Sequence, residues 1–97
     1  MAISINMTSR DGLNRPAAYL KISALNINTI DKFVEVTVAC FNSEESRMAG
    51  YEPFQSTSFL ITEYSLFNPA TFELGENAIS RAYEWLMSNI WSEGIAV

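Results

Sequence analysis

The chain has 97 residues, of which 48% are hydrophobic, and its formal net charge at neutral pH is −5. This length suits one domain around one core, which buries about 60–65% of the unfolded surface, and is too short for two domains. Because neutralisation of phosphates supplies most non-specific affinity for nucleic acid, an acidic chain whose six basic residues are scattered is expected to bind neither DNA nor RNA.

The N-terminal segment is rich in polar and turn-forming residues. It lacks the basic start and apolar run of a secretory signal, and no apolar stretch in the chain approaches the ~20 residues of a membrane span. We expect a protein made and used as a soluble chain. Residues 1–16 are interpreted as an N-terminal arm or short edge strand, ahead of a single α+β domain over residues 17–97. Ile3, Ile5 and Met7 alternate with polar residues, and the sequence leaves open whether this strand joins its own sheet or a neighbour's.

The segment from Ala18 to Ile27 alternates in the manner of a half-buried strand. Leu20, Ile22 and Ala24 share one face, which we expect to point inward. Asparagine, threonine and aspartate residues follow and predict a loop of about five residues.

A second strand is predicted from Phe33 to Phe41, paired with the first as an antiparallel hairpin. Val34, Val36 and Val38 are expected to face inward. Cys40, the only cysteine, shares their parity, so we expect a small buried apolar side chain there.

The middle of the chain contains two connections and a third strand. Residues 42–50 predict a polar turn or a single helical turn that ends at Gly50. Residues 55–64 predict a strand with apolar residues on both faces, which favours either a central place in the sheet or a partner subunit covering its outer side. The loop from Ser65 to Gly75 is expected to include a short helical turn behind Pro69.

The last third predicts one amphipathic helix, with Asn77 as its N-cap, followed by an uncharged tail over residues 94–97. The residues expected to face the sheet are Ile79, Ala82, Tyr83, Leu86 and Ile90, and those expected to face water are Ser80, Arg81, Glu84, Ser88 and Asn89. The whole chain is therefore predicted to be α+β, a small antiparallel sheet of three to four strands packed against one C-terminal helix.

Catalytic and cofactor-binding patterns are missing from the sequence. Histidine is absent, a single cysteine excludes a thiolate metal cage, and neither a phosphate-binding glycine loop nor the spacing of a calcium loop occurs. An enzyme would have to be built on acidic residues such as Glu35 and Glu63, whose separation nothing in the sequence fixes. Because acidic residues on exposed faces are ordinary solubility features, we expect no enzymatic activity, no cofactor and no metal.

The aromatic residues outnumber what a core of this size is expected to hide. We therefore predict an interface whose anchors are Phe67, Phe72, Trp85 and Trp91, with Ile3 and Ile5 of the N-terminal segment joining a neighbour. The alternative is that loops fold over the second face of the sheet and bury most of the rings.

Several segments resemble small proteins encoded among the tail genes of tailed bacteriophages and prophages. They are Tyr19-Leu20-Lys21-Ile22, then Val34 to Phe41 with the polar connection that ends in Arg47, then Ala82-Tyr83-Glu84-Trp85-Leu86 and the terminal Glu93 to Val97. The resemblance spans about residues 17–97, and the chain departs from the pattern because it ends without the final acidic residue.

The resemblance implies a virion structural protein in or near the tail or baseplate, made in the host cytoplasm and without catalytic residues. Its partners would be other copies of itself and larger virion structural proteins, and it would be a homo-oligomer in the particle, with no membrane partner. The alternative is a soluble accessory or inhibitor-type domain that binds one host or viral partner.

Overall fold

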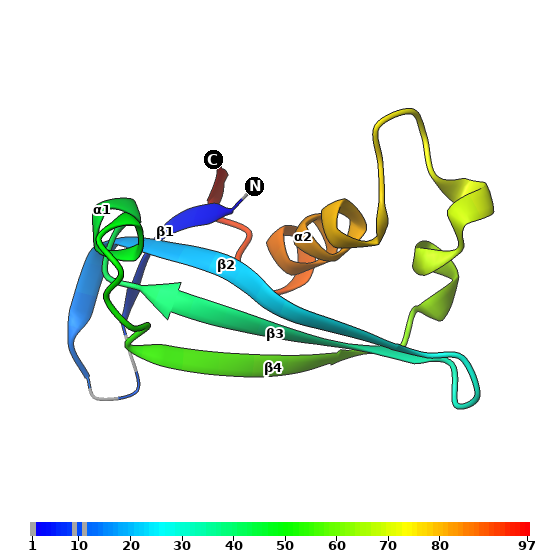
Figure 1. The fold of residues 1–97 in the computed structure, drawn as a ribbon, viewed down its shortest axis with the longest axis horizontal. Coiled ribbons are helices and arrows are strands. Elements are labelled where there is room, and N and C mark those ends of the chain that lie inside the picture. The colour runs from blue at the N-terminus through cyan, green and yellow to red at the C-terminus, as the bar shows by residue number, and fades with distance from the viewer. Residues whose placement is uncertain (1, 9, 11) are drawn as a thin grey trace.

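The computed structural model describes residues 2–8, 10 and 12–97. Figure 1 shows a curved sheet with one longer helix lying across it. The elements in chain order are β1 (Ile3–Thr8), β2 (Asn14–Asn28), β3 (Phe33–Phe41), α1 (Glu44–Met48), β4 (Gln55–Ile61), the 3-10 turns η1 (Tyr64–Phe67) and η2 (Pro69–Thr71), α2 (Ala78–Asn89) and β5 (Ile95–Ala96). The predicted α+β class is confirmed, with five strands among the described residues where three to four were expected.

The sheet is antiparallel throughout, in the order β4-β3-β2-β1-β5. The predicted hairpin of β2 and β3 is confirmed, and its register runs from Tyr19 opposite Phe41 to Asn28 opposite Phe33. In Figure 1 this hairpin extends beyond α2. β3 is rich in β-branched residues, which pack well on a pleated surface.

One face of the sheet forms the core with α2. The fully buried side chains of the sheet include Val34, Val36, Val38 and Cys40, all on the parity that the sequence predicts. From α2, Ala82, Tyr83 and Leu86 pack onto this inner face and are buried.

The ends of the predicted helical stripe differ from expectation. Ile79 is 50% exposed and Ile90 40% exposed, although both were expected to face the sheet. Ile79 lies in the first turn and Ile90 is the C-cap, so both lie at the ends of the contact. Ser80, expected in water, is buried because it completes a capping box with the correctly predicted N-cap Asn77.

A β-bulge in β2 overturns the expected orientation of Ala24. Ile22 lies opposite Val38, whereas Ala24 lies opposite Thr37, so the register shifts between Ile22 and Ala24. One extra residue reverses the parity of everything after it, which leaves Ala24 exposed. The Ile22 N–H at this bulge donates to the Tyr83 hydroxyl on α2 at 2.9 Å.

Both ends of the chain add strands to the chain's own sheet. β1 lies between β2 and β5, with Ile3 opposite both Leu20 and Ala96. Ala2 and Val97 exchange two backbone hydrogen bonds of 3.0 Å, and the termini lie side by side in Figure 1. The uncharged tail thus forms β5, which the sequence analysis missed because two residues carry no period.

The third predicted strand, β4, pairs with β3 alone among the described strands. Of its two expected settings, the central place is wrong, and cover by a partner subunit stays a prediction. The predicted turns before and after β4 are confirmed. α1 is a short helix followed by Gly50 at a φ of +86°, and η2 starts at Pro69.

Among the described residues, no helix has both the length and the apolar character needed to cross a bilayer.

Candidate functional site

The outer edge of β4 pairs with no other strand of the described part of the chain. Figure 1 shows β4 along one margin, with β3 on its inner side. In an antiparallel ladder, alternate residues direct both their N–H and C=O groups away from the neighbouring strand. The Ser56 carbonyl accepts a hydrogen bond from the Arg10 side chain, so Ser56 belongs to the outward-directed set. By the same alternation, Ser58 and Leu60 also direct their backbone groups outward.

Arg10 covers one half of this edge. Its guanidinium donates to the Ser56 carbonyl at 2.6 Å and lies 3.4 Å from the Thr57 hydroxyl, and its backbone N–H donates to the Gln55 side chain at 3.1 Å. Arg10 belongs to the connection between β1 and β2. The other half, at Ser58 and Leu60, has no partner for its outward backbone groups among the described residues.

The sequence of β4 lacks the features that usually protect an edge strand. Residues 55–61 read Gln-Ser-Thr-Ser-Phe-Leu-Ile, with no charge, no proline and no glycine, and their register with β3 runs without a bulge. Proteins commonly block open edges with lysine, proline, bulges or very short strands. The opposite edge follows that rule, since β5 has two residues. The exposed half of β4 is therefore available for pairing with another strand.

The two faces of β4 differ in character. Leu60 points to the outer face opposite Glu35 and is 56% exposed. Phe59 points to the inner face, where its ring meets Trp91 edge-on at 5.4 Å between centroids. Ser58 shares a hydroxyl contact of 3.0 Å with Thr37 of β3. We call the segment from Ser58 to Ile61, with its outward backbone groups, the open edge.

The predicted anchors divide into buried and accessible side chains. Ile3 is fully buried and Phe67 is 5% exposed, so both belong to the core and drop out of the predicted interface. Ile3 lies opposite Ala96 of β5, and both Ile3 and Phe67 are members of the hydrophobic core cluster. Ile5 and Trp91 are partly buried against the core and keep some accessible surface.

Phe72 and Trp85 are half-buried and held by polar contacts. The Trp85 ring N–H donates to the Glu63 carboxylate at 2.9 Å. Phe72 lies below the guanidinium of Arg81, 5.4 Å from its ring centroid. These rings therefore help to attach the loop that follows β4 to α2.

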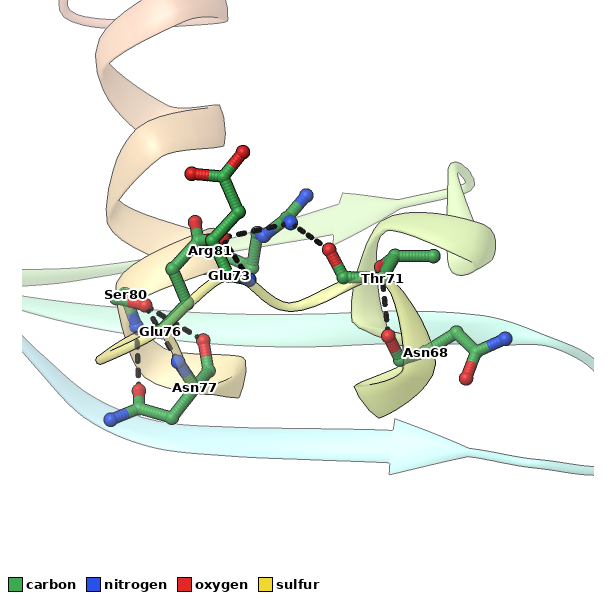
Figure 2. A network of polar contacts seen from close by, with 7 residues as sticks. All are labelled: Asn68, Thr71, Glu73, Glu76, Asn77, Ser80 and Arg81. Carbon is green, nitrogen blue, oxygen red and sulfur yellow. Dashed lines mark hydrogen bonds and ion pairs between the residues drawn. The ribbon is translucent and has the colours of Figure 1, made fainter.

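Arg81 joins that loop to α2, as Figure 2 shows. Its guanidinium donates to the Thr71 carbonyl at 2.6 Å and pairs with Glu76 at 3.0 Å, and Glu76 also accepts from the Glu73 N–H at 2.8 Å. The Glu73 N–H and Arg81 lower the pKa of Glu76, whereas desolvation and the neighbouring Glu76 raise the pKa of Glu84. This network attaches the loop to the first turns of α2.

A groove of about 530 Å³ lies on the outer face at the other end of the molecule. α1 forms one wall and the β1 and β5 side forms the other. It is lined by Ser4, Ala17, Tyr19, Ser43, Glu44, Glu45, Met48 and Val97. Met48 is 72% exposed and Val97 56% exposed, so the groove combines apolar walls with an acidic rim.

The remaining candidates for a reactive or metal-binding site are the single cysteine and the acidic residues of the sheet. Burial raises the pKa of the Cys40 thiol to about 11, which keeps it protonated at neutral pH. Glu35 lies on the outer face of β3, and Glu63 follows β4 and is engaged by Trp85. Within the described part of the chain, no three acidic, cysteine or histidine side chains gather to hold a metal ion.

Sequence reasoning did not identify the open edge as a site. The uncharged run of hydroxyl and apolar residues was visible, but whether a strand is central or at an edge depends on pairing, which the run does not encode. No family model, curated protein or solved structure matches this chain.

Proposed function

We propose that this protein is a bacteriophage virion structural protein, associated with the tail or baseplate, that acts through protein–protein contacts. Its partners are other copies of itself and larger virion proteins. The resemblance to small tail-gene proteins supplies the viral context. The observation that carries the contact function is the open edge of β4, an uncharged strand whose outward backbone groups at Ser58 and Leu60 have no partner among the described residues.

The physical reason is the cost of leaving such an edge exposed. Each unpaired N–H and C=O group of an edge is a template for another chain, and an edge without charge or proline invites pairing. A protein that works alone gains from blocking this edge. A protein that works in an assembly can use this edge to form backbone hydrogen bonds with a neighbouring chain. Side-chain contacts then determine which chain binds there.

The test is whether the protein is part of intact particles. Particles purified by density gradient are digested and the peptides of this chain are quantified against those of a known tail protein. We expect a fixed ratio that survives washing in high salt. A chain that stays in the soluble fraction and is absent from particles would contradict the virion role.

A second candidate is the accessory or inhibitor-type domain that binds one partner. The groove between α1 and the C-terminal strand favours it, because apolar walls from Met48 and Val97 with an acidic rim suit a basic, partly apolar peptide. Under this candidate the protein is recovered from lysate with one partner and not from particles.

A further inference from the structure

We propose that the open edge of β4 pairs antiparallel with the same edge of a second copy, joining two five-stranded sheets into one continuous sheet about a two-fold axis. This inference rests on the proposed function for its biological setting and names the partner of the same site. Three observations about β4 identify a second copy as the partner: which backbone groups have no hydrogen-bond partner among the described residues, which are already hydrogen-bonded, and where the charges lie.

The free backbone groups define the register. Arg10 already occupies the Ser56 carbonyl, so the groups left for a partner are the N–H and C=O of Ser58 and Leu60. In an antiparallel pair, two residues directly opposite exchange both hydrogen bonds. Placing Ser58 opposite Leu60 of the second copy satisfies all of these groups at once and leaves the Arg10 contact intact. The symmetric alternative, Ser58 opposite Ser58, would compete with Arg10 for Ser56.

The side chains accept this register. The two-fold axis then passes between the two Phe59 residues, which face each other on the inner side as a close, non-hydrogen-bonded pair. Each Phe59 ring is already fixed edge-on against Trp91, so the pairing extends an existing aromatic contact. On the outer face, the exposed Leu60 gains cover from the second chain around Ser58.

The charges along β4 suit a second copy. The strand carries no charged residue from Gln55 to Ile61, so two copies of this edge meet without like charges along the seam. Glu63 lies beyond the strand and stays with its own helix, where it accepts from the Trp85 ring N–H at 2.9 Å.

The paired segment is short, so the dimer is expected to be weak. A contact of this kind falls below the ~1,200 Å² that stable complexes bury, and it should dissociate on dilution. In a particle, many simultaneous contacts would hold the same pairing in place.

The first experiment is light scattering across a concentration series for the full chain and two variants. Ser58→Pro removes one outward N–H without breaking the bonds to β3, whereas Ser58→Ala keeps that N–H, and both remove the hydroxyl contact with Thr37. We expect the parent and Ser58→Ala to rise toward the dimer mass and Ser58→Pro to stay monomeric at tenfold higher concentration. Circular dichroism verifies that all three are folded. A parent that stays monomeric, or a Ser58→Pro variant that dimerises like Ser58→Ala, overturns the proposal.

The second experiment tests the register by disulfide formation. Ser58→Cys and Leu60→Cys are prepared separately and oxidised alone or as a mixture, while Cys40 stays buried and protonated. We expect a cross-linked dimer mainly in the mixture, because residue 58 faces residue 60 of the other copy within the Cα separation that a disulfide accepts. Efficient cross-linking of Ser58→Cys alone would overturn the register.

The two proposals fail separately. A chain that is monomeric in both experiments yet present in particles retires the pairing and leaves the virion role. A chain that pairs as described but is absent from particles retires the virion role and leaves the pairing.

Discussion

Tyr83 joins the helix to the one irregular point of the longest strand pair. Its hydroxyl accepts the Ile22 N–H, which the bulge turns away from the ladder. Burial is the main cause that raises the pKa of Tyr83, in keeping with a hydroxyl held inside the fold. A phenylalanine at this position would fill the same space and leave the N–H without a partner.

Tyr83→Phe is therefore expected to lower the free energy of unfolding by about 1–2 kcal/mol, the lower part of the range for an orphaned polar group, because the site is only partly buried. Chemical denaturation measures the change. Tyr51→Phe is the matched control, since Tyr51 is 69% exposed and should change stability little. Equal midpoints for the two variants would show that the hydroxyl does not support the bulge.

At the scale of elements, β5 depends on a close approach that only glycine permits. A Cβ at Gly94 would lie 2.6 Å from the Ile3 Cγ2 atom and 3.1 Å from the Trp91 carbonyl oxygen. Ile3 is fully buried, so it has little room to move aside. Gly94 therefore sets how tightly the C-terminal strand lies against β1.

Gly94→Ala is expected to destabilise the protein by about 1–3 kcal/mol, as overpacking at a buried contact usually does. The amide of Val97, which donates to Ala2, should then exchange faster with solvent. Ser92→Ala in the preceding turn serves as the control. Unchanged stability together with an equally protected Val97 amide would contradict this account of β5.

The elements also show which features the sequence predicts. Val34, Val36, Val38 and Cys40 follow a strict alternation, and the structure buries all four. Ala24 was placed on the wrong face because a bulge is not visible in residue types. The position of β4 at the edge depends on long-range pairing, so the sequence predicted the strand but not the site on it.

The same limit applies to the anchors. Hydrophobic character alone made Ile3 and Phe67 candidates for an interface, yet packing against β5 and α2 places them in the core. Ser58 and Leu60 were overlooked because their importance lies in backbone groups, which every residue has.

At the scale of the whole molecule, β5 covers one edge of the sheet at Ile3 and Ser4, and Arg10 covers half of the edge formed by β4. The remaining half is where we place the contact between copies. The inner face is filled by α2 and the loop that Arg81 attaches, so growth of the sheet at β4 requires no rearrangement of the core.

Amide hydrogen exchange at different protein concentrations tests this central claim most directly. The Ser58 and Leu60 amides point away from β3, so they should exchange quickly in dilute solution and become protected as concentration rises. The Phe59 amide, which points into the sheet, should be protected at every concentration and serves as the internal reference. Fast exchange at Ser58 and Leu60 at all concentrations, alongside a protected Phe59, would contradict the claim that the open edge of β4 is an interface.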